Sequence, residues 1–286
     1  MKKITGVSLL VLCLLFAGRT FAFDKQAAVN ELYTKSGLEQ QLGQFGPEVA
    51  AGFKGMKNLT DEERYKVYEL VIGAYDSKNL TPVLKAYLVN NLSEKDITST
   101  LTWLNSPLGS QITKIEIDAS SQDPGKDLEK KAYIESLSTN PPSSQRIDLL
   151  NRLGDITNGA EFVYSVEIFM ADMMMKAMPK DLTPEQKQAV QKARFRYDLM
   201  KDQIEGQIKQ SQFTSGLYTY KDISDDQLSQ YINFLSTPEG KEYTLTTESA
   251  LKEAMKAPGQ KIVDYIAAIL EQKMKEKAEA AKAGLN

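Results

Sequence analysis

Residues 93–109 read SEKDITSTLTWLNSPLG, and residues 224–240 read SDDQLSQYINFLSTPEG. The two stretches align without a gap at an offset of 131 residues. Each begins with a serine followed three residues later by Asp or Gln, which is a sequence signature of a helix start. An aromatic residue, a leucine and then Ser/Thr-Pro-x-Gly follow in both. This repeat predicts two copies of one helical unit.

The rest of the chain also has the apolar spacing of helices. Apolar residues recur at intervals of three and four, as at Leu228, Ile232 and Leu235, and alternating β-branched runs are missing. Thr60 and Thr183 begin two further capping boxes, in which a side-chain hydroxyl accepts a hydrogen bond from a free backbone N–H. We therefore predict an all-α fold of about a dozen helices.

Each copy carries a second Pro-Gly pair, at residues 124–125 and 258–259. Because proline disrupts the turn that precedes it, we predict a helix break at both pairs. A long middle helix is expected at about 183–213, with Gly206 as its weak point. The Lys/Glu/Ala-rich tail from Glu271 is helical by propensity.

The segment at 138–144, with two prolines among small polar residues, reads as a linker. It divides the chain after residue 22 into a first helical repeat domain at 23–140 and a second at 141–286. We predict two tandem antiparallel helical bundles related by internal duplication, each with its own core.

The first 22 residues read as a secretory signal peptide. Lys2 and Lys3 precede an apolar run at 7–17, and Thr20 and Ala22 fit a cleavage site. The run is too short to span a bilayer. We expect a periplasmic or secreted bacterial protein with no membrane span after cleavage.

Composition excludes several chemistries. The only cysteine, Cys13, lies in the signal segment, and the chain contains no histidine. Disulfides, Cys/His zinc sites and histidine-dependent nucleophiles are therefore excluded from the mature chain. Beyond residue 22 the chain has 32 basic and 38 acidic residues, which is not the charge of a nucleic-acid binder. We expect no cofactor and no nucleic-acid partner.

The repeated motif supplies the candidate partner-binding residues. They are the aromatic, proline and glycine of each copy: Trp103, Pro107, Gly109, Phe234, Pro238 and Gly240. The competing interpretation is that the aromatics pack between helices and the turns only reverse the chain.

Methionines at 170, 173, 174 and 178 form the candidate metal site. Met170, Met174 and Met178 share one helix face, with Met173 beside them. Thioether sulfur suits Cu(I), but methionine also fills irregular cores and interfaces.

Acidic pairs offer a route to carboxylate catalysis. They are Glu62/Glu63, Asp225/Asp226 and Glu116/Asp118, which we expect at helix N-termini or on exposed faces. Separately, Leu182-Thr183-Pro184-Glu185-Gln186 resembles a signature of small periplasmic stress chaperones and is also an ordinary capping box.

The order of capped helix, aromatic, leucine and Ser/Thr-Pro-x-Gly resembles the bacterial domain of unknown function 2059. The resemblance covers about 85–120 and 215–255, and leucine replaces the usual second aromatic at Leu104 and Leu235. It implies a secreted all-helical protein and no catalytic residues.

We expect a non-enzymatic periplasmic interaction or scaffold module that binds an unknown envelope protein or peptide. Two alternatives remain open: a chaperone or metal-stress protein that uses the methionines, and a carboxylate-dependent hydrolase of the cell envelope.

Overall fold

The computed structural model describes residues 23–53, 59–121, 123–176, 178, 183–282 and 284. Over these residues the chain forms thirteen α-helices and no β-strand, so the predicted all-α fold is confirmed. The helices are α1 (Lys25–Lys35), α2 (Leu38–Gly52), α3 (Asp61–Ala74), α4 (Ser77–Asn91), α5 (Glu94–Leu104), α6 (Pro107–Ala119), α7 (Pro124–Ser136), α8 (Ser144–Ile156), α9 (Gly159–Lys176), α10 (Pro184–Leu199), α11 (Lys201–Thr219), α12 (Asp225–Leu235) and α13 (Pro238–Lys282).

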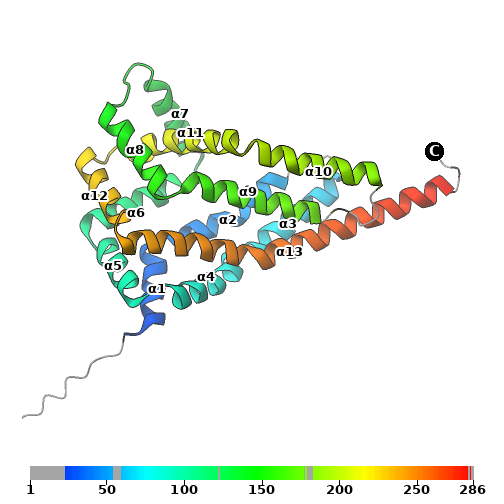
Figure 1. Cartoon of the computed structure of the whole chain (residues 1–286), viewed down its shortest axis with the longest axis horizontal. Helices are drawn as coiled ribbons and strands as arrows, with labels where there is room; N and C mark the ends of the chain where they lie inside the picture. Colours follow the sequence, from blue (N-terminus) through cyan, green and yellow to red (C-terminus); the bar gives the residue numbers. More distant parts are fainter. Residues whose placement is uncertain are drawn as a thin grey trace, which may run out of the picture.

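The helices form a wedge, with α5, α6, α8 and α12 gathered at the broad end and α13 running along its length (Figure 1). The signal segment at 1–22 lies outside the described residues. Within the described part of the chain, no helix has an apolar stretch long enough to cross a bilayer.

The predicted capping boxes are present at three helix starts. The hydroxyls of Thr60, Ser93 and Ser224 each accept a hydrogen bond from the backbone N–H three residues on, and the side chain there accepts one in return. Each cap of this kind contributes about 1 kcal/mol to stability.

The two Ser/Thr-Pro-x-Gly corners are built alike. Ser106 Oγ accepts from the Gly109 N–H at 3.0 Å, and Thr237 Oγ1 accepts from the Gly240 N–H at 3.0 Å. A Cβ on Gly109 would lie 2.1 Å from the Trp103 carbonyl oxygen, and one on Gly240 would lie 2.3 Å from that of Phe234. Glycine is therefore required because the preceding helix's backbone passes against it.

The second Pro-Gly pair corrects the sequence prediction. Pro124 begins α7 as expected, after Asp123 accepts from the Gly125 N–H at 2.8 Å. Pro258, in contrast, lies inside α13, a continuous helix of 45 residues in total. Gly259 packs so tightly that a Cβ there would lie 2.1 Å from Met173 Sδ. No capping side chain precedes Pro258, since residue 257 is alanine.

The predicted middle helix at 183–213 is also corrected. It divides into α10 and α11 at Met200 rather than at Gly206, which lies inside α11. Tyr197 and Arg194 of α10 bond to Glu167 and Asp172 of α9, at 3.1 and 2.9 Å. These contacts fix α10 along α9.

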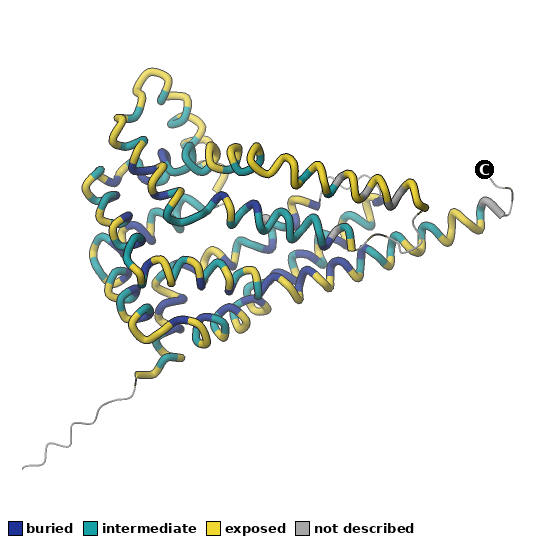
Figure 2. The backbone as a smooth tube through the Cα atoms, viewed as in Figure 1, coloured by how far each residue is buried: buried dark blue, intermediate teal, exposed yellow. Residues whose placement is uncertain are grey.

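Figure 2 marks the buried segments along the backbone. Their apolar residues form two groups. The first core contains residues of α1 to α5, Met173 of α9 and a stripe on α13 that includes Ala250, Ala254, Ile262 and Ile266. The second core contains residues of α8, α11 and α12 together with Ile112 of α6.

Each core draws residues from both sides of residue 140, so the expectation that each half buries its own core is not met. The helices that follow each corner contact helices of the other half of the chain. Helices α6 and α7 contact α11, whereas α13 packs against α3, α4 and α5. The amphipathic stripe of α13 explains this placement, because it covers the apolar faces of three first-half helices. The boundary at residue 140 and the internal duplication stay predictions.

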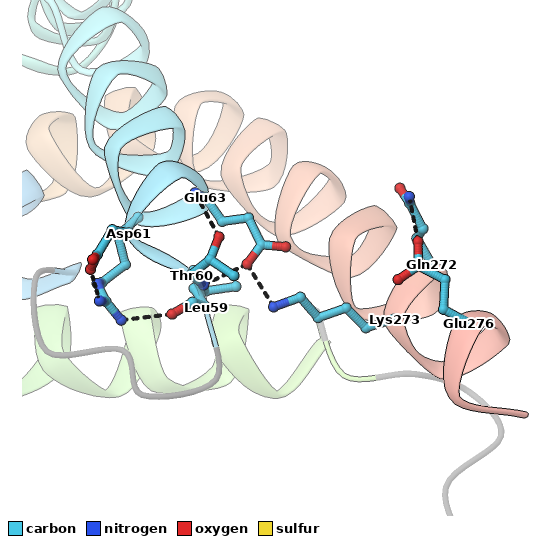
Figure 3. A network of polar contacts seen from close by, with 8 residues as sticks. Leu59, Thr60, Asp61, Glu63, Gln272, Lys273 and Glu276 are labelled. Carbon is cyan, nitrogen blue, oxygen red and sulfur yellow. Dashed lines mark hydrogen bonds and ion pairs between the residues drawn. The ribbon is translucent and has the colours of Figure 1, made fainter. Parts of the chain in front are cut away.

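The far part of α13 is attached to α3 by a polar network (Figure 3). Lys273 Nζ donates to Glu63 Oε2 at 2.6 Å, and the same carboxylate oxygen accepts from the Thr60 N–H at 2.6 Å. The tail expected to be helical from Glu271 is therefore part of α13. Its Lys273 pairs with Glu63, the glutamate of the α3 capping box.

Candidate functional site

The two motif aromatics meet at the broad end of the wedge. Trp103 of α5 stacks on Phe234 of α12 with ring centroids 4.9 Å apart and an interplanar angle of 6°. Trp103 also stacks on Tyr231, at 5.8 Å and 7°. Residues at the same position of the two stretches thus touch one another. Pairs of this kind contribute about 0.5–1.5 kcal/mol beyond their buried area.

A cavity of about 590 Å³ lies beside this aromatic stack. Its walls come from α6, α7, α8, α11 and α12. Leu150, Leu153 and Phe213 supply apolar surface, while Gln212 and Lys130 supply polar groups. This size and this mixture are typical of sites for small ligands.

One carboxyl group of the cavity wall is enclosed by tyrosine hydroxyls. Glu116 of α6 accepts a hydrogen bond from the Tyr220 hydroxyl at 2.6 Å and a second from the Tyr231 hydroxyl. Burial raises the pKa of Glu116 above its usual value, although both hydrogen bonds oppose the rise. Burial also raises the pKa of both tyrosines well above 10.0, so both keep their protons and donate.

Arg146 of α8 holds the segment that carries Tyr220. Its guanidinium donates to the carbonyl oxygens of Tyr220 at 3.1 Å and Ile223 at 2.5 Å. Arg146 Nε also pairs with Asp225 Oδ1 at 2.7 Å, and both side chains are largely buried. This arginine therefore fixes the turn between α11 and α12 and, with it, the tyrosine that meets Glu116.

The cavity also has charged groups at its edge. Lys209 Nζ pairs with Asp155 Oδ1 at 3.6 Å, and both side chains are mostly exposed. Lys130 of α7 is partly buried, and its Nζ donates to Ser215 Oγ of α11 at 3.0 Å. The two lysines thus differ, because one faces a carboxylate and the other a neutral hydroxyl.

A smaller cavity of about 210 Å³ lies on the other side of Glu116 and Tyr231, which line both. Its wall includes Trp103, Phe234 and Glu248 of α13. Loss of hydration raises the pKa of Glu248 from 4.5 to about 7, with Lys252 opposing and Glu161 reinforcing the rise. Two carboxyl groups with raised pKa values therefore line this cavity.

The six candidate partner-binding residues all lie at the two corners. Trp103 and Phe234 stack between helices, and Pro107 and Pro238 are the first residues of α6 and α13. The glycines take the close backbone approach described above. These are packing roles, and a role in binding a partner stays a prediction.

The methionines do not gather on one open face. Met173 is 6% exposed in the first core, and Met170 packs against that core with its Sδ accepting from the Tyr75 hydroxyl at 3.8 Å. Met178 lies beyond the end of α9 and is 39% exposed. The side chain of Met174 lies outside the described residues.

Most of the acidic candidates have structural partners. Glu62 pairs with Lys66, Asp118 with Lys114, and Asp225 with Arg146. Glu116 corrects the expectation of an exposed face, because the two tyrosines enclose its carboxyl group. In the chaperone-like segment, Pro184 begins α10 as the capping box predicts, whereas Leu182 lies outside the described residues.

The sequence reasoning named Glu116 only as part of an exposed acidic pair, and it missed Tyr220, Tyr231 and Lys130. The spacing contains a signal for Glu116. Leu108, Ile112 and Glu116 are four residues apart and so share one helix face, and Ile112 is 1% exposed. A carboxyl group in an otherwise apolar stripe marks a buried titratable group.

One apolar surface is exposed elsewhere. Phe195 and Leu199, one turn apart on α10, are 62% and 69% exposed, and Met200 beside them is 45% exposed.

Comparison with protein-family models, curated proteins and solved structures finds no match to this chain.

Proposed function

We propose that the protein is a non-enzymatic binding module of the bacterial cell envelope and that the 590 Å³ cavity holds its ligand. The observation that carries this proposal is the cavity's construction, with apolar walls around one enclosed carboxyl group and its two tyrosine donors. The signal-like sequence at 1–22 and the resemblance to the secreted domain 2059 support the location.

The cavity is a better candidate than the corner motifs for a ligand-binding role. The motif aromatics stack on each other, and the motif glycines pack against the backbone of the preceding helix. The cavity, in contrast, offers Lys130, Gln212 and the Glu116 carboxyl group beside apolar surface. Convergent polar groups in an apolar pocket are the usual arrangement for orienting a bound molecule.

Two glycines provide a matched test of this proposal. Gly154 lines the cavity and Gly206 does not, and a Cβ on either would meet no atom within 4 Å. Both lie inside helices, α8 and α11. We expect Gly154→Phe to fill the cavity and abolish binding of Nile red, a neutral apolar dye, and Gly206→Phe to leave binding unchanged. Equal dye binding by both variants would contradict the proposal.

A second candidate function, a carboxylate-dependent envelope hydrolase, is favoured by Glu116 and Glu248 lining one cavity. Such enzymes need one protonated and one ionised carboxyl group. Here burial raises the pKa of both groups, so their environments do not push the two pKa values in opposite directions as an acid and base pair requires. A cleared band on a peptidoglycan zymogram that Glu248→Gln abolishes would favour the hydrolase over the binding module.

A further inference from the structure

We propose that the larger cavity binds an amphiphile with one negative charge, whose charged group pairs with Lys130 and whose apolar body lies against Leu150, Leu153 and Phe213. This inference rests on the proposed binding function and names the chemical class of the ligand. It is carried by the surroundings of Lys130, whose partner is a neutral hydroxyl, and by the position of the apolar wall.

Lys130 is the unbalanced charge of the cavity. Its Nζ is partly buried and donates to the neutral Ser215 hydroxyl at 3.0 Å. Among the described residues, no carboxylate forms an ion pair with it. A partly buried ammonium group that lacks a carboxylate is incompletely compensated, and an anion placed beside it would supply that compensation.

The other charged groups of the cavity have polar partners of their own. Lys209 faces Asp155 at 3.6 Å. The Glu116 carboxyl group is held by the hydroxyls of Tyr220 and Tyr231, which both donate to it. Lys130 is therefore the cationic group of the described cavity lining that has no carboxylate partner, and a single anionic group would supply one.

The apolar wall lies within the same cavity as Lys130. Leu150 and Leu153 are 5% and 8% exposed, and Phe213 packs against the second core beside them. Gly216 of α11 lies close to Leu150, and both residues line the cavity. An apolar body lying here would remove hydrocarbon from water, at about 25 cal/mol per Å² of buried surface.

Three probes with the same chain and different head groups test the charge preference: dodecanoate, dodecanol and dodecylamine, each below its micelle-forming concentration. We expect displacement of Nile red from the mature protein to be strongest for dodecanoate, about tenfold weaker for dodecanol and weakest for dodecylamine, a difference that corresponds to one charge-assisted contact.

Lys126 provides the matched control for Lys130. Both lie on α7, but Lys126 pairs with Asp118 at 3.9 Å and does not line the cavity. We expect Lys130→Gln to bring dodecanoate down to the affinity of dodecanol and to leave dodecanol unchanged. Lys126→Gln removes the same charge from the same helix and should keep the preference for dodecanoate.

The outcomes separate this inference from the proposed function. Equal affinity for dodecanoate and dodecanol, or a preference for dodecanoate that survives Lys130→Gln, would overturn the anionic ligand. The binding function would still stand if Gly154→Phe blocked both probes. Failure of all three probes and of Nile red to bind would overturn the binding function itself. Circular dichroism of each variant establishes that the fold is retained.

Discussion

The two repeat stretches agree at their first proline and differ at their second. At the first, Ser106 and Thr237 cap the next helix with matching 3.0 Å bonds. At the second, a new helix begins at Pro124, whereas α13 continues without a break through Pro258. The same Pro-Gly pair therefore has opposite outcomes within one chain.

The difference lies in the residue before each proline. Helices begin at Pro107, Pro124 and Pro238, where the preceding Ser, Asp or Thr accepts from a backbone N–H. Pro47 and Pro258 lie inside helices and follow Gly46 and Ala257, which have no capping side chain.

Pro82 completes the comparison. It lies inside α4 although Thr81 precedes it, and the Thr81 hydroxyl is bonded to the Tyr33 hydroxyl at 2.8 Å. A free capping side chain, more than proline, thus marks the helix start in this protein.

The shared corner predicts the largest effect. Gly109→Ala and Gly240→Ala would each force a Cβ against a backbone carbonyl oxygen that no rotamer change can move. We expect each to lower the free energy of unfolding by about 3 kcal/mol, as overpacking does. Urea denaturation measures the loss. Gly125→Ala is the control, because its Cβ would meet only the Asp123 side chain at 3.2 Å. A small effect at one corner alone would show that the two corners differ.

Substitution of the second proline is expected to have an intermediate effect, and to raise the free energy of unfolding rather than lower it. Proline inside a helix costs about 3 kcal/mol, and the buried ring of Pro258 offsets part of this by packing. We expect Pro258→Ala to raise the free energy of unfolding by about 2 kcal/mol. Pro124→Ala, at the first position of α7, should change it little. Destabilisation by both substitutions would contradict the distinction drawn between them.

The smallest expected change in stability comes from a position at which the two copies differ. Ile117 of α6 corresponds there to Glu248 of α13. The pKa of Glu248 is raised from 4.5 to about 7, so the folded protein keeps a proton that the unfolded chain loses from pH 4.5 upward. Stability therefore falls between pH 4.5 and 7. After allowance for partial exposure, we expect Glu248→Gln to stabilise the protein by about 1 kcal/mol at pH 8.

At pH 4 the same substitution should have almost no effect, because Glu248 is then protonated in both states. Thermal unfolding at the two pH values measures the difference. Glu276→Gln, on an exposed part of the same helix, controls for the loss of one charge. An equal shift for Glu248→Gln at both pH values would contradict the assignment.

Local signals in the sequence were sufficient for the helical class and for most helix starts. The capping serines and threonines act within four residues, so their effect is readable without tertiary contacts. The break predicted at Pro258 was wrong because the prediction rested on proline alone and overlooked Ala257, which has no side chain that could cap a helix. The crossing of α13 to the first-half helices depends on contacts distant in sequence.

The candidate site was only partly predictable for the same reason. The pattern marks Glu116 as a carboxyl group on an apolar helix face. Its partners Tyr220 and Tyr231 lie more than a hundred residues away, on the turn and helix that Arg146 positions. Lys130 looks like any surface lysine until α7 is placed against α11. Cavities form between elements, so local patterns do not show them.

Photo-crosslinking tests the central claim, that the larger cavity holds the ligand, most directly. A dodecanoate with a diazirine near its chain end would be irradiated with the mature protein and the labelled residues located by mass spectrometry. The label is expected on residues that line the cavity, such as Leu150 and Phe213, and should be lost in Gly154→Phe. Labelling of the exposed Phe195 and Leu199 on α10 instead, unchanged by Gly154→Phe, would contradict the claim.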